Sequence, residues 1–563
     1  MSGLNLLVFR EGRRRASGKE LKAALIAQLE QVRSHFLRRP LLAALLLAGE
    51  IECGTADSDP QAARDCELFT DDIAKALLAG EKTPSVGSES PRRDLDFLIN
   101  AARALPALEQ LSIPTPEGFA YYALHPLAYA DGMQQIPMSE RLLIVGIRSI
   151  GTTLSAVAAA AARERGIAAE RVTVRPQGHP YNRKVEFTTE QMAVVCRAVS
   201  LGASFVVVDE GPGLSGSSFL AAAEALARAG APVEKIMLIS SHAPKLDALC
   251  AENAAQRWQR FRCIPVATEA RKPAEGVEFI GGGQWRSRVF TNESKWPAAW
   301  ISFERLKYLS SSSQCEERRV FKFAGLGHYG DAVLECEKRV AAAGFGQTPR
   351  EESDGFISYP WIEGRPSAAS DLSPRMMARL AEYCAFRQKT FGVELSNLGA
   401  LQNMAEHNLG ELGFDLSVGL RLEWPVIADG RMQPYEWILN KEGKLLKTDS
   451  GSHGDDHFFP GPTDIAWDLA GAIVEWKMNE AQKTEFLNLY CRASGDDATA
   501  RIDGFIIAYA VFRLAYCLMA ANAMSGSDEQ PRLQRAADVY RAVLANWRTQ
   551  LSEISASLFA VSS

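Results

Sequence analysis

The strongest constraint on the fold of this chain is an alternation of strand-like and helix-like segments that begins near residue 141. Short apolar runs rich in Val and Ile, among them RLLIVGI, RVTVRP, SFVVVDE and EKIMLISS, alternate with Ala-rich segments as far as residue 241. Because parallel strands need long crossover connections, this order predicts parallel strands joined by right-handed helical crossovers. The expected fold class is α/β, with an open, doubly wound parallel sheet in this part of the chain.

The rest of the chain is predicted to form further domains before and after this sheet. A chain of 563 residues is long enough for several domains, since single cores stop growing at about 250–300 residues. Residues 1–115 are rich in Ala, Leu and Glu at helical spacing and predict a helical N-terminal region. We assign 116–245 to the sheet domain and 246–315 to a connecting region, and 316–563 to a C-terminal domain of strands followed by long amphipathic helices. The prediction is an α/β multidomain protein.

Composition excludes several function classes. The net charge of -6 argues against bulk binding to nucleic acid. The longest apolar runs have about nine residues, too few to cross a bilayer, and no leader-like pattern opens the chain, so we expect a cytoplasmic protein without a membrane partner. The ten cysteines show no C-x-x-C pair, which predicts reduced thiols and no zinc site.

A first candidate site is the stretch VVVDEGPGLSGSSFL, Val206 to Leu220. The acids Asp209 and Glu210 end an apolar strand, and a loop of small residues then opens a helix. Free N–H groups at a helix N-terminus favour a phosphate, whereas adjacent acids would repel a bare polyphosphate and suit sugar hydroxyls. The predicted ligand is a sugar phosphate, bound by the loop residues Gly211, Gly213, Ser215, Gly216, Ser217 and Ser218.

This stretch resembles the ribose-phosphate motif of type I phosphoribosyltransferases, over residues 116–245. The resemblance implies that Asp209 and Glu210 bind the ribose hydroxyls of phosphoribosyl pyrophosphate (PRPP) and that residues 215–218 bind its 5′-phosphate. The chain departs from the motif by carrying four residues, GPGL, between the acids and Ser-Gly, where three are usual, and by its Pro212. An altered substrate pose and a binding site without chemistry are both compatible with this departure.

The same resemblance assigns the cations that would meet the pyrophosphate. Arg148 and Ser149 stand where that family has its pyrophosphate loop, and the segment RPQGHPYNRKVEF resembles its mobile hood. Catalysis would rest on Mg²⁺ and on cations that neutralise the leaving group. The roles implied are catalysis for Asp209, Glu210 and Arg148, and PRPP binding for Ser149, Arg183 and Lys184, with Arg175 and His179 as further hood residues. A plain strand-to-helix turn and an ordinary basic loop remain as alternatives.

A second candidate site lies in the C-terminal part. VFKFAG puts Lys322 on a strand before a helix that carries Glu335 and Glu337, and PTDIAWDLAG follows far downstream. Over residues 316 to about 555 this order resembles aminoglycoside-phosphotransferase-like kinases, which implies a two-lobed α+β fold that binds ATP and Mg²⁺. The roles implied are contact with the nucleotide for Lys322 and for Glu335 or Glu337, metal binding for Glu436 and Asp449, and a brace under the catalytic loop for Asp468.

The catalytic loop departs from that family. Its His-Gly-Asp-x-x-Pro-x-Asn pattern aligns best with DGRMQPYE, so Arg431 replaces the base Asp and Glu436 replaces the Asn. Arginine cannot accept a proton. Asp429, His453, Asp455 and Asp456 are the candidates that could substitute for the base. An alternative interpretation is a metal site formed by His453, Asp455, Asp456 and His457.

Two functions compete at this point. One is an enzyme that transfers a phosphoribosyl group from PRPP to an unidentified base or small metabolite, with an atypical kinase-like domain that phosphorylates a related intermediate. The other is a non-catalytic PRPP or nucleotide sensor with a pseudokinase domain. The helical N-terminal region also suggests a homodimer interface.

Overall fold

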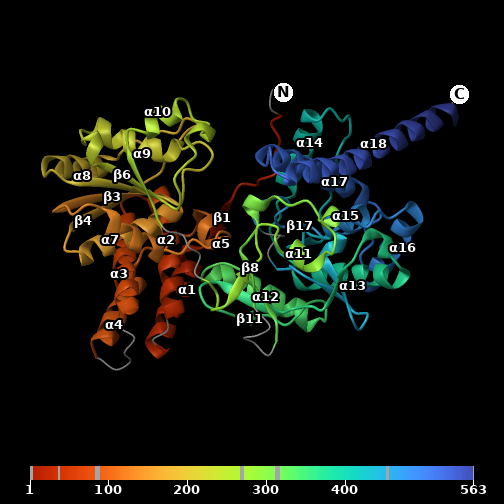
Figure 1. The fold of residues 1–563 in the computed structure, drawn as a ribbon, viewed down its shortest axis with the longest axis horizontal. Helices are drawn as coiled ribbons and strands as arrows, with labels where there is room; N and C mark the ends of the chain where they lie inside the picture. Colours follow the sequence, from red (N-terminus) through yellow and green to blue (C-terminus); the bar gives the residue numbers. More distant parts are fainter. Residues whose placement is uncertain are drawn as a thin grey trace.

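The computed structural model describes residues 4–35, 38–82, 89–266, 272–310, 317–451 and 456–561. In Figure 1 the chain forms two halves, with the helices and sheet of the first 266 residues on one side and the remaining residues on the other. The N-terminus lies against the second half, so the first residues cross from one half to the other.

The first half contains the predicted parallel sheet. Its strand order is β4-β3-β5-β6-β7, and every neighbouring pair is parallel. The strands are β3 (Arg141–Ile147), β4 (Ala168–Val174), β5 (Ser204–Val208), β6 (Ile236–Ser240) and β7 (Arg262–Pro265). The order reverses between β3 and β5, and the carboxyl ends of strands at such a switch point are where open α/β sheets bind ligands. The doubly wound parallel sheet is confirmed.

Helices cover both faces of this sheet because its apolar residues alternate. Leu142 and Val206 face a core shared with α7 (Ile150–Glu164), whereas Leu143 and Val207 face the core under α8 (Thr189–Ser200) and α9 (Ser217–Arg228). Shorter helices are α5 (Glu117–Ala120), α6 (Leu127–Gly132) and α10 (Ala254–Trp258). The carboxyl ends of the strands therefore remain accessible between two helical layers.

The predicted helical N-terminal region is present and packs on α7. It consists of α1 (Gly18–His35), α2 (Arg38–Ser58), α3 (Ala63–Lys82) and α4 (Glu89–Ala104), with a small ribbon of β1 (Arg13–Ala16) and β2 (Leu111–Pro114). A Cβ on Gly49 would lie 1.9 Å from the Thr153 hydroxyl, so α2 and α7 are in close contact. Residues before β1 leave this region: Leu6 and Val8 are buried in the core of the second half.

The second half begins with an antiparallel sheet of order β11-β12-β10-β9-β8. Its strands are β8 (Val277–Phe279), β9 (Lys307–Ser310), β10 (Arg319–Phe323), β11 (Arg350–Glu351) and β12 (Phe356–Pro360), and α12 (His328–Ala342) follows β10. The segment 246–315, predicted as a connecting region, is thus no separate linker: β7 completes the parallel sheet, and β8 and β9 belong to the antiparallel one. These strands are short and only partly buried, so they lack the apolar runs that marked the others.

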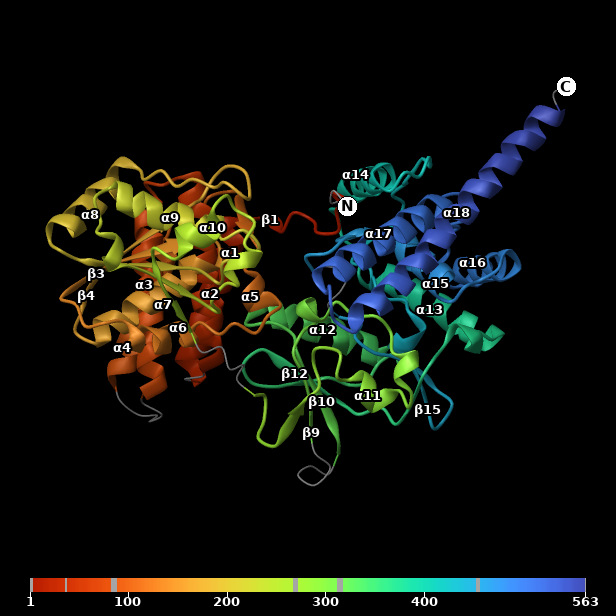
Figure 2. The same cartoon turned by 45° about the horizontal axis from the view of Figure 1, so that its top comes forward.

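Helices and small ribbons make up the rest of the second half. The ribbons pair β13 (Gly364–Pro366), β15 (Trp437–Asn440) and β16 (Leu445–Lys447), and β14 (Pro425–Val426) with β17 (Thr463–Asp464). The helices are α11 (Arg286–Val289), α13 (Pro374–Thr390), α14 (Leu398–Glu411), α15 (Ala466–Glu475), α16 (Glu480–Ser494), α17 (Ile502–Ala523) and α18 (Glu529–Val561). A sheet followed by a helical part is the two-part order expected for this region (Figure 2).

Among the residues that the structure describes, one helix is long and apolar enough to cross a membrane by length and composition. It is α17, with a hydropathy of 1.8 over its most apolar window. In the structure 83% of that window is buried inside the fold, where α17 packs against α14, α15 and α18. Its apolar character is therefore used in the core of the second half.

Candidate functional site

The switch point of the parallel sheet brings the two predicted acids together with their loop. Asp209 and Glu210 follow β5 and are half-buried. The Asp209 carboxylate accepts a hydrogen bond from the Glu210 N–H (2.8 Å), and the Glu210 carboxylate accepts one from the Gly118 N–H (3.0 Å). Within the described ranges neither acid forms an ion pair, so both carboxylates remain available to a hydroxyl-bearing ligand.

Burial changes the acidity of both groups. It raises the pKa of Asp209 to about 7. Burial, together with the charges of Glu117 and Asp209, raises the pKa of Glu210 to about 8. Both carboxyl groups are therefore poised to change protonation near neutral pH, and a bound cation or hydroxyl cluster would favour their ionised forms.

The loop after these acids has the backbone geometry of a tight cradle. Gly213 and Gly216 have φ values of 58° and 70°, the left-handed region that favours glycine. Ser215 and Ser217 donate hydrogen bonds to the Pro180 carbonyl (2.9 and 2.5 Å). The predicted hood therefore lies over the serine loop; it is a hairpin closed by the Gln177–Lys184 bridge.

The predicted pyrophosphate loop shows backbone strain at one residue. Ser149, which precedes α7, has φ 131° and ψ -118°, a conformation that costs a non-glycine residue about 1–3 kcal/mol. Thr152 and Thr153 are buried in the first turns of the helix. Strain of this kind is concentrated at binding loops, which supports the assignment of this turn to the site.

The cation predicted beside it is placed differently. The Arg148 guanidinium donates to the Asp57 carboxylate (3.2 Å) and to the Ala56 and Thr173 carbonyls (3.0 and 3.2 Å). Arg175 is bound to the same Asp57 carboxylate at 2.6 and 3.1 Å. In this structure the charge of Arg148 is paired with Asp57 of α2, and the catalytic role implied for Arg148 stays a prediction.

The other two predicted hood cations are not paired with Asp57. The Arg183 guanidinium donates to the Pro176 carbonyl (3.2 Å), and the Lys184 side chain is exposed on the hairpin. Neither forms an ion pair among the residues that the structure describes. These two side chains are the cations that remain for an anionic ligand at the switch point.

The second half holds a cleft between its sheet and its helical part. It encloses about 1050 Å³. Lys322 enters it from β10 and forms an ion pair with Asp449, which follows β16 and has φ 55°. Lys307 of β9 lies 3.8 Å from the same carboxylate. Burial, with repulsion from Arg305 and Lys307, lowers the pKa of Lys322 well below its ordinary value.

Of the two glutamates predicted beside Lys322, only Glu337 faces the cleft. It is buried and accepts hydrogen bonds from the Ser450 N–H (3.1 Å) and hydroxyl (2.8 Å). Glu335 points to solvent and pairs with Arg339 one helical turn away (3.1 Å). A nucleotide-binding role for Glu335 is therefore wrong, because residues two apart on a helix do not share a face.

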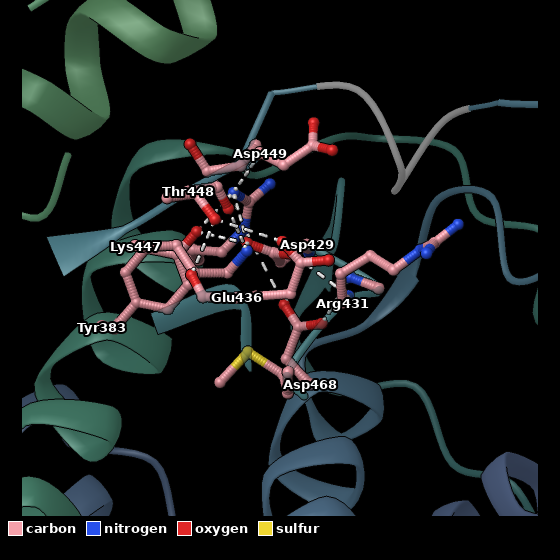
Figure 3. Close-up of polar contacts among 12 residues, drawn as sticks. Tyr383, Asp429, Arg431, Glu436, Lys447, Thr448, Asp449 and Asp468 are labelled. Atoms are coloured by element: carbon pink, nitrogen blue, oxygen red, sulfur yellow. Dashed lines mark hydrogen bonds and ion pairs between the residues drawn. The ribbon is translucent and has the colours of Figure 1, made fainter. Parts of the chain in front are cut away.

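Figure 3 shows the loop that corresponds to the catalytic loop. The Asp468 carboxylate accepts hydrogen bonds from the Asp429 and Gly430 N–H groups (2.7 and 2.9 Å), which is the bracing role predicted for it. Asp429 is fully buried and accepts a hydrogen bond from the Tyr383 hydroxyl (2.5 Å), with the Lys447 ammonium 3.5 Å away. Asp429 is thus enclosed in the structure and does not replace the missing base.

The position of the missing base is occupied by Arg431. Its side chain is half-buried and extends away from Asp429 and Asp468 in Figure 3. Glu436, in place of the metal-binding Asn, is buried and accepts a hydrogen bond from the Thr448 hydroxyl (3.3 Å). Glu436 and Asp449 both line the cleft, so the two predicted metal-binding carboxylates lie on the same cavity.

The polar set near Asp449 gives no support to a separate metal site. His453 and Asp455 lie outside the described residues. The Asp456 carboxylate accepts a hydrogen bond from the Phe458 N–H (2.8 Å), and the His457 ring is stacked on Phe9 with 5.6 Å between centroids. Among the described residues no group of three or more metal-binding side chains was found.

Sequence reasoning missed one element of the cleft. Residues 281–283 form a triple-glycine turn after β8, and the Trp285 ring that follows lines the cavity. Gly282 and Gly283 have φ values of 60° and 78°. Arg286 fixes this turn to α18 through a buried ion pair with Glu529 (2.6 Å). The sequence signal that could have predicted this turn is the run of three glycines after the strand-like segment VEFI.

One short segment touches both halves of the chain. Besides the bond from Gly118 to Glu210, the Phe119 carbonyl accepts from Leu326 at the turn after β10 (2.9 Å). Next to them, the Tyr122 hydroxyl lies 3.4 Å from the His457 ring. Residues 117–122 therefore connect the switch point of the sheet to the second half, at the turn after β10 and at His457.

Comparison with known proteins gives structural neighbours only. No protein-family model matches the chain, and no curated protein matches it. An ethanolamine kinase of Plasmodium vivax matches at 10% identity, over 52% of this chain and 90% of its own, with a TM-score of 0.30. The macrolide 2′-phosphotransferase MphH of Brachybacterium faecium matches at 14% identity, over 46% of this chain and 97% of its own, also with a TM-score of 0.30.

A third neighbour is the spectinomycin phosphotransferase APH(9)-Ia in complex with ADP and spectinomycin. It matches at 12% identity, over 47% of this chain and 88% of its own, with a TM-score of 0.30. These three neighbours are kinases or phosphotransferases, and none is a phosphoribosyltransferase. At such scores the roles of individual residues follow from the contacts described above.

Proposed function

We propose that the second half binds a nucleoside triphosphate with Mg²⁺ and transfers its terminal phosphoryl group. The observation that carries this proposal is the Lys322–Asp449 ion pair in a cleft that is also lined by Glu337 and Glu436. A buried lysine and three carboxylates at one cavity suit phosphoryl transfer, because catalysis of this reaction rests on positioning and charge.

The donor set fits Mg²⁺. Glu436 and Asp449 offer carboxylate oxygens, and Mg²⁺ is commonly held by one or two protein carboxylates together with phosphate oxygens and waters. When bound, the ion would neutralise charge on the phosphates. Lys322 would exchange its contact with Asp449 for the phosphates, and Glu337 would hold the loop at Ser450 in place.

The cleft also offers a surface for the base. Tyr359 and Trp361, around the end of β12, also line the cleft, and the Arg318 guanidinium lies 4.7 Å from the centre of the Trp361 ring. Flat apolar walls of this kind suit a purine ring.

The test is ADP binding by calorimetry with and without Mg²⁺. Asp449→Asn should abolish the Mg²⁺ dependence, and Lys322→Met should weaken ADP binding by about tenfold or more. Glu335→Gln, on the solvent face of α12, is the matched control, and this variant should bind ADP like the wild type. Mg²⁺-dependent binding that survives Asp449→Asn would remove the metal assignment.

For the first half we propose PRPP binding at the switch point, with phosphoribosyl transfer to an unidentified acceptor as its activity. What supports binding is the pair of half-buried acids, Asp209 and Glu210, beside a left-handed glycine loop. The engagement of Arg148 and Arg175 by Asp57 favours a second candidate, a PRPP sensor without transfer.

Labelled PRPP distinguishes these two functions. The sensor binds PRPP without releasing pyrophosphate in the presence of Mg²⁺ and a pool of bases, whereas the enzyme releases it. Asp209→Asn combined with Glu210→Gln should weaken PRPP binding in either case. Binding at wild-type affinity by this double variant would exclude both candidates at this site.

A further inference from the structure

A second cavity adjoins the nucleotide cleft. It has an empty volume of about 830 Å³, part of which is open to solvent, and it shares Lys322, Glu436 and Asp449 with the cleft. A molecule held there would lie on the far side of the groups that contact the terminal phosphate. The second cavity is therefore in position to hold the phosphoryl acceptor, and this assignment rests on the function proposed for the second half.

The walls of this cavity combine cations with aromatic rings. The cations are Arg305, Arg431 and Arg513, besides the lysines of the cleft. The rings are those of Tyr121, Trp300, Phe303, Phe458 and Tyr516. Aromatic walls favour a flat apolar body, and guanidinium groups favour a planar anion such as a carboxylate or phosphate.

Two of these arginines have no carboxylate partner among the described residues. Arg305 is buried, and its guanidinium donates only to the carbonyls of Ala120 (3.1 Å) and Ala324 (2.8 Å) in this part of the chain. For the Arg431 guanidinium no hydrogen bond or ion pair is formed with any described residue. Arg305 is buried and Arg431 is half-buried, and a cation shielded from water without an ion-pair partner is costly, so the cavity favours an anionic ligand.

The acids on the same cavity are already engaged. Glu304 accepts hydrogen bonds from Lys307 (2.9 Å) and from the Gly283 N–H. Asp449 pairs with Lys322, and Asp456 accepts from the backbone of its own loop. The Arg431 and Arg305 guanidinium groups are attracted by the charges of Glu436 and Asp456, but neither guanidinium forms an ion pair with a carboxylate among the described residues.

We propose that the second cavity binds an aromatic acceptor whose reacting group is an oxyanion, a carboxylate or a phosphate monoester, held by Arg431. An oxygen lone pair of this group attacks the γ-phosphorus. The new P–O bond forms as the bond to the β–γ bridging oxygen breaks, and ADP leaves with that electron pair. No proton is removed, so Arg431 at the position of the base is no obstacle, whereas a hydroxyl acceptor would need a base.

The test uses the full chain with ADP and Mg²⁺ and three probes of similar shape: phenyl phosphate, benzoate and benzyl alcohol. Calorimetry should show binding of an oxyanion at least about tenfold tighter than of the alcohol. The stronger of phenyl phosphate and benzoate identifies the reacting group. Arg431→Gln should weaken the binding of that oxyanion by roughly tenfold to a hundredfold and leave the affinity for ADP unchanged. Arg431→Lys should retain part of the affinity for the oxyanion.

Arg365→Gln is the matched control. Arg365 is an exposed arginine that pairs with Asp371 (2.6 Å) outside this cavity, so its loss should change neither affinity. The inference is overturned if the alcohol binds as well as the oxyanions, if neither oxyanion binds, or if Arg431→Gln weakens ADP instead. Absence of ADP binding by the wild type is a different result: it overturns the proposed function itself.

Discussion

At the scale of single residues, the acids at the switch point link protonation to stability. In the unfolded chain Asp209 and Glu210 lose their protons near pH 4, whereas in the folded chain their pKa values are about 7 and 8. Between these limits the folded state binds more protons than the unfolded state. The free energy of unfolding therefore falls as pH rises from 5 to 8.

Asp209→Asn with Glu210→Gln should remove this part of the pH dependence. One pKa unit corresponds to about 1.4 kcal/mol, so we expect the double variant to gain on the order of 2–4 kcal/mol relative to wild type between pH 5 and pH 8. Urea unfolding at both pH values measures it. Glu170→Gln, an exposed partner of Arg197 on the same sheet, is the control; parallel pH profiles for wild type and double variant would contradict the prediction.

At the scale of elements, α2 is pressed against the turn that follows β10. Gly327 has φ 54°, and a Cβ there would lie 3.2 Å from Ala43 and Leu46 of α2. Gly344, after α12, has φ 76° and nothing within 4 Å of such a Cβ. The two glycines thus share the backbone requirement and differ in their surroundings.

Gly327→Ala should therefore destabilise the protein more than Gly344→Ala. In each variant the left-handed backbone lowers the free energy of unfolding by roughly 1–2 kcal/mol. In Gly327→Ala the overlap of the new methyl group with α2 lowers it further, typically by about 1–3 kcal/mol. Differential scanning calorimetry measures both. Equal losses of stability in the two variants would contradict the prediction, because α2 would then have moved to accommodate the added methyl group.

At the scale of the whole molecule, the N-terminal arm joins the two halves. Val8 is fully buried and Leu6 nearly so in the core of the second half, while Leu7 and Leu4 are exposed. The arm is fixed by hydrogen bonds of Leu7 with the Asn408 side chain (2.8 and 2.7 Å). Side chains alternate along an extended segment, so only one face of the arm contributes to the core.

Leu6→Ala should lower the stability of the second half by about 2–5 kcal/mol, because it removes buried methyl groups and leaves a cavity. Leu7→Ala, the exposed neighbour, should change it by less than about 1 kcal/mol. Proteolysis, with identification of the cleaved segments, measures directly how readily the second half unfolds in each variant. A loss confined to the N-terminal helices would contradict the assignment of the arm.

Residues 117–122 also predict communication between the sites. Gly118 contacts Glu210, and Tyr122 contacts His457, which lines the second cavity beside the cleft. A ligand at the switch point should therefore change the affinity of the cleft for ADP. We expect PRPP to shift the Kd of ADP by about fivefold or more. Tyr122→Phe should reduce this shift, and Phe97→Ala, an exposed site on α4, should leave it unchanged. Calorimetric titration of ADP with and without PRPP measures the effect.

The sequence by itself determined the elements and the local motifs. The alternation of apolar runs and helices predicted the parallel sheet, because the period of buried positions is set by the backbone itself. The resemblance to kinases, carried by VFKFAG and PTDIAWDLAG, named Lys322, Asp449 and Asp468, and the structure places the first two on the cleft and bonds Asp468 to the loop at Asp429. Each of these inferences depends on a few neighbouring residues.

Only the tertiary structure decided which charges are free to act. Arg148 and Arg175 read as site cations until Asp57, about ninety or more residues earlier, proved to hold both. The arm and the triple-glycine turn gain their roles from segments hundreds of residues away. Charge compensation depends on distance in space, which a linear pattern does not contain, and for that reason the partner of each arginine became visible only in the fold.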